Sequence, residues 1–353
     1  MSRGTSPDRV LLLHNHDNSW TAADLIEVAE ENRILMNGLR ANGYQVDDLK
    51  VHDSVLQAFQ GTGYTPDQWL IFNWCEGYAD RPWDYDGVAE ELEQLHFTYT
   101  GSGPWALRVS RDKSLVRQVL ARAGVALPIG AVAHTPDNLA WTIYPAIVKP
   151  VNQHGSYGID RAALVEDEQQ LRERVEYVCD LFQAPALIEE YIDGPEYHVT
   201  VLGNSPPEVL PEVQVEYSNV ANWRDRIYTY EAKFDLRSTA LQQIRFLCPA
   251  MLEVSTHQAI QRAALRAYEA LRCRDYARID LRLRAGRPYI IDINPNADIN
   301  SESMVLMATE AAGLNYNDMV GQLVGFAAER WRPESVLATV PWAADLHRKW
   351  VDS

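Results

Sequence analysis

The stretch that most constrains this chain is residues 275–303, DYARIDLRLRAGRPYIIDINPNADINSES. Charged and apolar residues alternate from Arg278 to Arg282, as they do along a strand with one face in a core. A turn signal around Gly286 separates this strand from a second one at residues 289–294. The pattern therefore predicts a half-buried β-hairpin.

Paired acidic residues lie on the polar face of this hairpin. A turn centred on Gly286 would place Asp280 opposite Asp292 and Arg278 opposite Asn294. Opposed carboxylates repel, because their side chains begin only about 5 Å apart. A divalent cation removes that repulsion, and magnesium favours one or two carboxylates together with phosphate oxygens. The stretch indicates a metal–nucleotide site, and a hairpin with a merely solvated polar face is the alternative.

Length and composition narrow the class of protein. A chain of 353 residues with 46% hydrophobic content can form two or three domains with ordinary cores. The formal net charge of -17 argues against nucleic acid as a partner, since that binding depends on Lys and Arg. We find no apolar run typical of a signal peptide or a membrane span, so we expect a cytoplasmic protein without a membrane partner. The 4 cysteines are spaced neither for a zinc site nor for a disulfide framework.

Alternating strand and helix patterns cover the first hundred residues and predict a small α/β domain with a mostly parallel sheet. A first buried strand at Val10–His14 is followed by helical spacing over Ala22–Asn42. No Gly-x-Gly-x-x-Gly fingerprint follows that strand, which disfavours a nicotinamide dehydrogenase. His14 lies at the end of the strand, where open sheets bind ligands, so we predict a substrate contact there; ordinary loop polarity is the alternative.

Two lysines stand near predicted phosphate-binding features. Lys113 lies near the start of an amphipathic helix predicted over residues 110–123, where a solvated surface charge is the alternative. Lys149 ends an apolar strand and leads into the loop VNQHGSYGID. Gly155 and Ser156 in that loop can offer N–H groups and a hydroxyl to phosphate oxygens; a plain glycine turn is the alternative.

Further polar candidates follow along the chain. Residues 187–203 are predicted to form two strands about an Asp-Gly-Pro turn, with Glu189 on the first and Glu196 on the second. These carboxylates could accept hydrogen bonds from an amino group and from ribose hydroxyls, or simply face solvent. Residues 205–243 show little periodicity and predict a long loop that carries Lys233 near an opening.

The order of these segments is more specific than any one of them. DKSLVRQVLARAGVALP, IVKPVNQHGSYGI, LIEEYIDGPEYHVTVLG, TYEAKF, ARIDLRL and IIDINPNADINSES follow one another in an arrangement that resembles the ATP-grasp superfamily. Within it the chain is most similar to D-alanine–D-alanine ligase and related carboxylate–amine ligases. The resemblance covers roughly residues 99–328 and implies an α/β (α+β) ATP-grasp fold. It implies a Rossmann-like parallel-sheet domain (1–110), two α+β subdomains that enclose ATP (111–195 with a phosphate flap, 196–330 with the metal site) and a C-terminal extension (331–353).

The resemblance also implies roles for individual residues and cofactors. ATP and Mg2+ are expected, with Mn2+ as the alternative metal. The implied ATP contacts are Lys113, Lys149, Gly155, Ser156, Glu189, Tyr191, Ile192 and Glu196. The implied metal ligands are Asp280, Asp292 and Asn294, and the catalytic residues are Arg278, Lys233 and Ser156 of the flap. Ser303 matches a group that binds substrate, and with His14 and Asp298 it completes the predicted substrate set.

The implied reaction is formation of an amide or peptide bond through an acyl phosphate, with release of ADP and phosphate. Positioning and charge neutralisation are what phosphoryl transfer chiefly needs, and the predicted Lys, Arg and metal ligands supply both. The expected partners are a small carboxylate and an amine, such as amino acids or peptides, and the resemblance suggests a homodimer. An ATP-binding regulatory or non-catalytic ATP-grasp module is the alternative.

Departures from the family pattern concern the substrates. The cell-wall ligases have a His-Gly-x-x-Gly-Glu-Asp-Gly run where this chain has FNWCEGYADRPWDYDG, and a Tyr where it has Phe234. After the metal Asn they carry Pro-Gly-Met-Thr, whereas this chain carries Ala297, Asp298, Ile299 and Asn300. An acidic residue there would repel a carboxylate or attract an amine. We therefore predict acid and amine substrates other than two D-alanines.

Overall fold

The computed structural model describes residues 7–153, 155–235 and 237–332, which fall into two compact units. Unit 1 combines the chain up to Pro104 with the segment from Leu314 onward, and unit 2 is Trp105–Gly313. The predicted C-terminal extension lies outside the described residues except for its first two positions.

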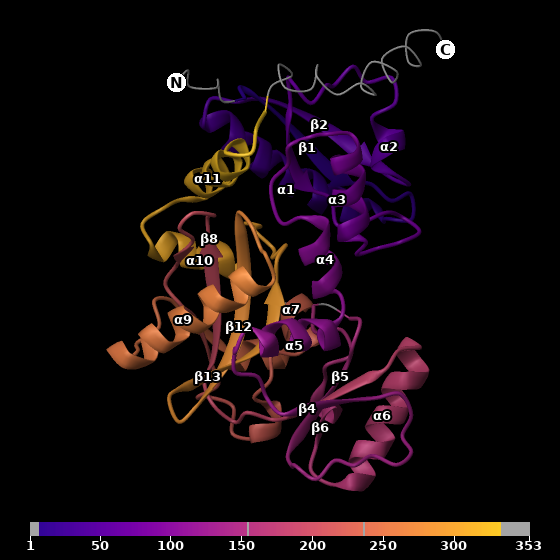
Figure 1. The fold of residues 1–353 in the computed structure, drawn as a ribbon, viewed down its shortest axis with the longest axis vertical. Coiled ribbons are helices and arrows are strands. Elements are labelled where there is room, and N and C mark those ends of the chain that lie inside the picture. The colour runs from indigo at the N-terminus through magenta and orange to yellow at the C-terminus, as the bar shows by residue number, and fades with distance from the viewer. Residues whose placement is uncertain (1–6, 154, 236, 333–353) are drawn as a thin grey trace. The chain divides into compact units, whose positions relative to one another are not determined.

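A parallel sheet in the order β2-β1-β3 forms the centre of unit 1. The apolar residues of β1 from Val10 to Leu13 are fully buried, as expected for a central parallel strand covered by helices. The α/β prediction for the first hundred residues is thereby confirmed (Figure 1). The elements of unit 1 are β1 (Arg9–Asn15), α1 (Ala22–Ala41), β2 (Gln45–Val51), α2 (Val55–Ala58), β3 (Leu70–Trp74), α3 (Tyr85–Gln94) and α11 (Tyr316–Ala328).

Helix α11 belongs to unit 1, although the predicted C-terminal subdomain extends to residue 330. Its apolar face, which includes Met319 and Val320, is fully buried, and the helix lies against α1. Gly38 of α1 permits this close approach, since a Cβ there would lie 2.9 Å from a methyl carbon of Val320. The last helix therefore returns to the first domain, a long-range contact that its own periodicity does not encode.

Unit 2 contains a small antiparallel sheet in the order β4-β7-β5-β6, covered by α6. Leu171, Val175 and Val178 of α6 are fully buried against this sheet. Figure 1 shows these elements at the magenta end of unit 2. Their bounds are β4 (Gly130–Ala133), β5 (Ala146–Pro150), β6 (Leu164–Val165), α6 (Glu168–Phe182) and β7 (Ala186–Glu190), with a short 3-10 turn η1 (Arg161–Ala163) before β6.

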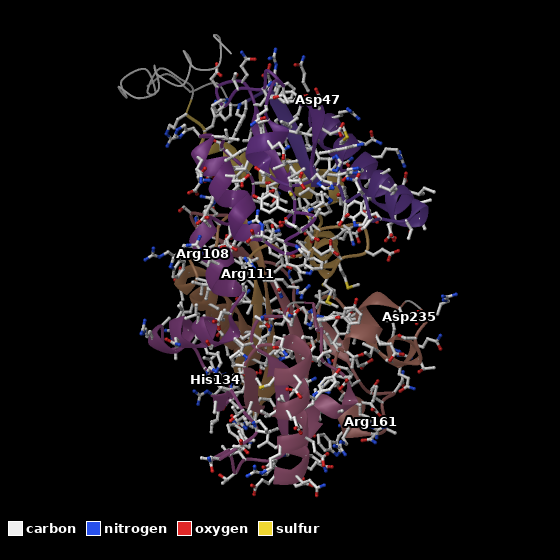
Figure 2. All side chains as sticks on the ribbon, turned by 90° about the vertical axis from the view of Figure 1, so that its right-hand side faces the viewer. Asp47, Arg108, Arg111, His134, Arg161 and Asp235 are labelled. Carbon is white, nitrogen blue, oxygen red and sulfur yellow. The ribbon has the colours of Figure 1, made fainter. Side chains whose placement is uncertain are left out.

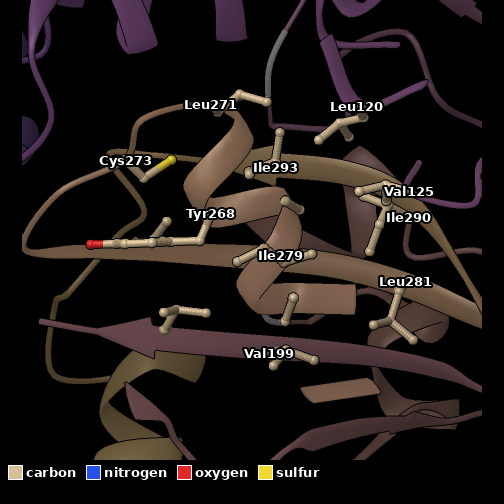
Figure 3. Packing of buried hydrophobic residues seen from close by; sticks show 14 of the residues in the cluster. Leu120, Val125, Val199, Tyr268, Leu271, Cys273, Ile279, Leu281, Ile290 and Ile293 are labelled. Carbon is tan, nitrogen blue, oxygen red and sulfur yellow. The ribbon is translucent and has the colours of Figure 1, made fainter. Parts of the chain in front are cut away.

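A larger antiparallel sheet runs in the order β11-β10-β8-β12-β13, with β9 paired to β8. Helix α9 lies across one face, where Tyr268 and Leu271 pack on Ile279, Ile290 and other buried residues (Figure 3). The strands are β8 (Glu196–Leu202), β9 (Glu208–Val209), β10 (Val213–Glu216), β11 (Arg245–Leu247), β12 (Tyr276–Arg284) and β13 (Arg287–Asn294). The helical segments are α4 (Pro104–Ser110), α5 (Lys113–Arg122), η2 (Trp223–Asp225), α7 (Tyr230–Phe234), α8 (Thr239–Gln243), α9 (Val254–Ala270) and α10 (Met304–Ala311).

Several local predictions need correction. The helix predicted over residues 110–123 is α5, but it begins at Lys113, because Asp112 caps it by accepting hydrogen bonds from the backbone N–H groups of Ser114 (2.7 Å) and Leu115 (3.2 Å). The long loop predicted over residues 205–243 contains β9, β10 and three short helical segments, and Lys233 lies on α7. Strands β10 and β11 are only four and three residues long, which is too short for a clear periodicity.

The two strands predicted about the Asp-Gly-Pro turn exist, but they do not pair with each other. Strand β7 joins the small sheet and β8 joins the large one. Gly194 lies in the connection and passes so close to β12 that a Cβ would lie 1.8 Å from the carbonyl oxygen of Leu283. The turn therefore links the two sheets of unit 2 instead of closing a hairpin.

The β12–β13 hairpin has the predicted pairing, with Asp280 opposite Asp292 and Arg278 opposite Asn294. Its polar face does not lie in solvent, however, because the side chain of Asp280 is only 4% exposed. The prediction of a half-buried strand was therefore wrong for β12, because Asp280 and Arg282 of its charged face are buried as well and line a cavity of unit 2. Charged side chains that do face solvent, such as Asp47, Arg161 and Asp235, are spread over the exterior (Figure 2).

Candidate nucleotide site

A cavity in unit 2 lies between residues of the two antiparallel sheets. The space among its lining atoms amounts to about 820 Å³, including solvent at its mouth. Aliphatic and aromatic side chains, among them Ile147, Ile227 and Ile291, share the lining with many charged ones. Ten predicted site residues meet there: Lys113, Lys149, Ser156, Glu189, Tyr191, Ile192, Glu196, Lys233, Asp280 and Asp292.

Ion pairs hold the carboxylates contributed by the small sheet. The buried Glu189 accepts a hydrogen bond of 2.9 Å from Lys149 Nζ and a second one from Arg117. Glu190 accepts from both terminal nitrogens of Arg284 at 2.7 and 3.1 Å. In this structure the predicted phosphate contact Lys149 and the predicted base contact Glu189 are therefore partners of each other.

Two other lysines of the cavity lack such partners. Lys113 donates a hydrogen bond to the carbonyl oxygen of Gln153, and the ammonium of Lys233 lies 5.0 Å from the centre of the Tyr228 ring. Neither has an ion-pair partner within 4.0 Å among the described residues. Desolvation lowers the pKa of both lysines, and the positive charge of Arg278 adds to the effect on the pKa of Lys233. Their charges are thus available to an anionic ligand.

The floor of the cavity carries the predicted metal carboxylates. Arg278 donates to both oxygens of Asp280, at 2.8 Å from Nε and 3.0 Å from Nη2. Desolvation raises the pKa of the Asp280 carboxyl, but the charges of Arg278 and His198 and the hydrogen bond from Arg278 outweigh it, so the pKa is lowered. Asp292 is half-buried and has no ion-pair partner among the residues that the structure describes. One carboxylate is therefore fixed and ionised, while the other is free to bind.

Glu196 lies in the same floor, and both of its carboxylate oxygens have protein partners. Its Oε2 accepts hydrogen bonds from Arg282 Nε (3.0 Å), Arg282 Nη2 (2.7 Å) and the Tyr217 hydroxyl (3.0 Å). Its Oε1 lies 3.1 Å from His198 Nε2. The predicted ribose contact thus lines the cavity with its carboxylate already surrounded by protein donors.

The predicted phosphate flap lies next to this cavity. Gly155 and Ser156 have φ values of 63° and 64°, which orient successive backbone groups of the loop in the left-handed region. The Ser156 hydroxyl lines the cavity and donates to the carbonyl oxygen of Tyr228 at 3.0 Å. Tyr157 packs edge-on against Tyr230, with 5.3 Å between ring centres. These contacts tie the loop to the segment that carries Lys233.

The predicted substrate residues are not among those that line the cavity. Ser303 caps α10 by accepting from the backbone N–H of Leu306 at 3.1 Å. Asp298 accepts two hydrogen bonds from Asn300, at 2.9 Å from the backbone and 2.8 Å from the side chain, and desolvation raises the pKa of its carboxyl. His14 lies in unit 1 with both ring nitrogens engaged, Nε2 to Asp48 (3.1 Å) and Nδ1 to its neighbouring carbonyl (3.1 Å). His14 is therefore a buried residue near the end of the central strand of this sheet.

The segments that form this cavity are similar in sequence to a known protein family. A sequence profile described as "D-ala D-ala ligase C-terminus" matches residues 132–325, more than half of the chain. The chain belongs to the D-alanine–D-alanine ligase family. The matched range contains both sheets of unit 2 apart from the first two residues of β4, and it contains every predicted metal ligand.

Relatives of this family extend the match over most of the chain. A D-alanine–D-alanine ligase of Desulforudis audaxviator is 30% identical over 305 residues, which cover 84% of this chain and 92% of that protein. The corresponding ligase of Alcanivorax borkumensis is 32% identical, with 70% of this chain and 75% of that protein covered. An uncharacterized protein of Sinorhizobium fredii, y4sG, is 31% identical, with 76% and 77% covered.

Solved structures agree in fold. D-alanine–D-alanine ligase from Bacillus anthracis, complexed with ATP, superposes with a TM-score of 0.70 at 18% sequence identity, covering 93% of this chain and 99% of that chain. Another structure of the Bacillus anthracis ligase gives a TM-score of 0.71 at 19% identity. The ATP-grasp fold and the class of ADP-forming ligases that make C–N bonds are thereby confirmed, as are ATP and Mg2+ as the cofactors of this ligase family.

Other residues of this family member reach the cavity without having been assigned a role from the sequence. Arg282 and His198 line it, Arg117 binds Glu189, and Tyr217 binds Glu196. Strand alternation already placed Arg282 with Arg278 and Asp280, so a signal for Arg282 existed in the sequence. Among the residues that the structure describes, no helix is long and apolar enough to cross a membrane.

Proposed function

We propose that this member of the D-alanine–D-alanine ligase family joins a carboxylate to an amine at the expense of ATP, and that its two substrates are not both D-alanine. The observation that carries the proposal is the cavity floor, where Asp280 and Asp292 lie opposite each other in a cavity that Lys113 and Lys233 also line. Two carboxylates and two unpaired lysines form the arrangement that a metal-bound polyphosphate requires.

The charge distribution supports a polyanionic ligand. Four of the carboxylates that line the cavity are neutralised by protein cations: Glu189, Glu190, Glu196 and Asp280. Lys113 and Lys233 remain unpaired within the described chain, in a protein whose net charge is -17. A local positive surplus in an acidic protein selects an anion at that place, and a triphosphate carries the matching negative charge.

The donor set fits a hard cation. Asp280, Asp292 and Asn294 supply only oxygen ligands, which magnesium prefers. Within the described residues, no three His, Cys, Asp or Glu side chains are grouped so that they could hold a metal by themselves. A cation at these residues would therefore depend on nucleotide oxygens as further ligands. When bound there, magnesium would neutralise charge on the phosphates during transfer.

In the proposed mechanism the protein contributes position and charge. Lys113, Lys149 and the Ser156 loop hold the phosphates, and Lys233 and Arg278 face the phosphoryl group in transit. A substrate carboxylate oxygen attacks the terminal phosphorus of ATP, the bond to ADP breaks, and an acyl phosphate forms. The amine then attacks the acyl carbon, phosphate leaves, and the amine loses a proton to give the amide. The loop around Ser156 would exclude water, which otherwise hydrolyses the acyl phosphate.

Substrates other than two D-alanines are supported by the sequence departures. Asp298 stands where the cell-wall ligases have a Gly, and Phe234 stands where they have a Tyr. A carboxylate at Asp298 disfavours a second substrate whose own carboxylate must lie nearby, and it favours one that brings a positive group. We also propose a homodimer, as the resemblance implies, which size-exclusion chromatography with light scattering tests.

Release of ADP and phosphate in the presence of substrate libraries tests the proposed function. The protein is incubated with ATP, Mg2+ and pairs drawn from amino acids of both configurations, dipeptides and polyamines. We expect phosphate release only with particular acid–amine pairs, together with a product whose mass is the sum of both substrates less one water. Highest turnover with D-alanine alone would contradict the substrate proposal. No turnover with any pair, despite measurable ATP binding, would indicate a non-catalytic ATP-binding module instead.

A further inference from the structure

His198 is a buried histidine whose two ring nitrogens face two different carboxylates. The residue lies on β8 and is only 1% exposed, and it is among those that line the cavity. Its Nε2 lies 3.1 Å from Glu196 Oε1, and its Nδ1 lies 3.7 Å from Asp280 Oδ1. Glu196 is the predicted sugar contact, and Asp280 is a proposed metal ligand. One imidazole therefore lies between the groups expected to bind the two ends of a nucleotide.

The two oxygens of Glu196 are bound in different ways. Oε2 accepts three hydrogen bonds, two from Arg282 and one from the Tyr217 hydroxyl. Oε1 has His198 Nε2 as its one partner among the described residues. A carboxylate can only accept, so Nε2 carries the proton in this pair. Because each carboxylate oxygen offers about two lone-pair positions, Oε1 keeps one for a sugar hydroxyl, and His198 is the group that orients this oxygen.

The other ring nitrogen of His198 has no hydrogen-bond partner among the described residues. The 3.7 Å between Nδ1 and Asp280 Oδ1 is too long for a direct hydrogen bond. A buried polar atom without a partner is unfavourable by about 1–3 kcal/mol, and a ligand that supplies the partner removes this cost. Nδ1 is therefore open to a group of a bound metal–nucleotide complex, such as water on the metal or a phosphate oxygen.

The strand register holds His198 in this place. Strand β12 pairs with β8 so that Asp280 lies directly opposite His198. Glu196 lies two residues before His198 and hence on the same face of β8, about 7 Å away along the strand. Val199 and Val201 on the other face are buried in the core beneath α9. The imidazole cannot leave the cavity face unless the strand slips and brings these valines out of the core.

We propose that His198 is a positioning residue that joins the two ends of the nucleotide site. Through Nε2 it holds Glu196 Oε1 toward a sugar hydroxyl, and through Nδ1 it contacts the metal-bound phosphates beside Asp280. The proposal rests on the proposed function, because it requires that the nucleotide binds in this cavity. One side chain then influences both sugar recognition and metal dependence.

Two substitutions of His198 separate these two contacts. The amide nitrogen of the longer Gln side chain can take the place of Nε2, and the amide of the shorter Asn side chain can take the place of Nδ1. His198→Gln therefore keeps the donor to Glu196 and loses the contact beside Asp280. His198→Asn does the reverse, and His198→Ala loses both contacts.

Nucleotide binding to the whole chain, measured by calorimetry without acid or amine substrate, tests the contact with Glu196. A hydroxyl bound to a charged acceptor is worth about ten- to a hundredfold in affinity. We expect the wild type and His198→Gln to bind ATP at least about tenfold more tightly than 2′-deoxyATP or 3′-deoxyATP, whichever lacks the bound hydroxyl. In His198→Asn and His198→Ala this preference should fall below about threefold.

The magnesium concentration for half-maximal nucleotide binding should follow a different pattern. We expect it to rise about three- to tenfold in His198→Gln and His198→Ala, from the loss of one hydrogen bond, and to stay within about twofold of wild type in His198→Asn. His257→Ala is the matched control, since it removes a histidine 2.8 Å from the buried Glu212, and neither residue lines the cavity. It should change neither the nucleotide preference nor the magnesium dependence.

Four results distinguish the proposal from a histidine that only fills space. Gln and Asn variants that alter both properties alike, or alter neither, overturn it. Wild-type affinities for the three nucleotides that agree within about threefold overturn it without any variant, because Glu196 Oε1 is then not held for the sugar. A wild-type chain that binds no nucleotide overturns the proposed function as well. The expected ratios in a chain that turns over no acid–amine pair support the role of His198 and contradict the ligase function alone.

Discussion

We expect the replacement of Asp292 by Ala to lower turnover strongly while it changes the free energy of unfolding little. Asp292 lies opposite Asp280 on the adjacent strand, and Lys113 and Lys233 line the same cavity. Removing Asp292 relieves repulsion between opposed carboxylates, which is worth about 0.2–1 kcal/mol. It also removes attraction to the two lysines, which is of similar size in a solvated cavity. The two effects oppose each other, so we expect the free energy of unfolding to change by less than about 1 kcal/mol.

Turnover responds differently, because the two carboxylates are the charged groups proposed to hold the cation. Losing one of them weakens stabilisation of the transferring phosphate by about 3–4 kcal/mol, which corresponds to a rate loss of about 10²–10³. Asp292→Asn keeps the shape and removes the charge, so we expect a loss of the same order. The magnesium concentration for half-maximal turnover should rise in both variants.

Phosphate release measured against magnesium concentration, together with urea unfolding, tests this prediction. Asp180→Ala on the exposed face of α6 is the control, and it should leave both measurements unchanged. Retention of wild-type turnover and magnesium dependence by Asp292→Ala would refute the assignment of the metal ligands. A large loss of stability would refute the argument that repulsion and attraction cancel at this position.

Three further predictions concern other parts of the molecule. Desolvation lowers the pKa of Lys233, whose charged form binds phosphate, so kcat/KM should begin to fall at a pH below the usual pKa of lysine. In a pH–rate profile, Lys233→Arg should make that fall shallower. An unchanged slope would contradict the role given to Lys233. Gly194→Ala should destabilise unit 2 by about 1–3 kcal/mol or more in urea unfolding, because its Cβ would meet the Leu283 carbonyl, whereas Gly325→Ala, with open space around it, should be neutral or stabilising. Asp298→Gly should raise the use of D-alanine as second substrate by about tenfold, from the removal of one repulsive charge; an unchanged preference in competition assays would argue against a role in substrate choice.

The pairing of Asp280 with Asp292 could be predicted from the sequence, although the structure reaches it by a different route. Ala285 and Gly286 both have positive φ, 50° and 75°, and form a two-residue turn that pairs Arg284 with Arg287. Continued without interruption, this register would place Asp280 opposite Ile291. A β-bulge beside Asp280 leaves Ile291 as an extra residue and restores the pairing with Asp292.

The packing of the core explains the bulge. Ile290 and Ile293 are both buried in the cluster beneath α9, yet they are three residues apart and would face opposite sides of a regular strand. One inserted residue lets both enter the core and leaves Ile291 to line the nucleotide cavity. Three isoleucines in four positions were a signal for this irregularity in the sequence.

Partners of Glu196 could not be predicted, because they depend on pairing between strands that are far apart in the chain. Arg282 stands 86 residues after Glu196, and nothing local specifies the register of β8 against β12. The family resemblance pointed to a ribose contact at Glu196, and only the fold shows that four protein donors surround it. Local alternation identifies which residues share a face, whereas long-range pairing decides which charges neutralise each other.

The register of strands β8, β12 and β13 also determines how the functional side chains are arranged in the cavity floor. Strands β8, β12 and β13 lie side by side, so residues opposite one another form rows across them. Rows on the same face follow at every second residue, about 7 Å apart. The rows are Glu196 with Arg282, then His198 with Asp280 and Asp292, then Thr200 with Arg278 and Asn294. Under the proposed function, the first row carries Glu196, the predicted ribose contact. The second row carries both metal carboxylates, and the third carries the metal ligand Asn294 together with Arg278, which faces the phosphoryl group in transit. A one-residue slip of β8 would separate all three rows at once, so the single register that buries Val199 and Val201 in the core also aligns the site.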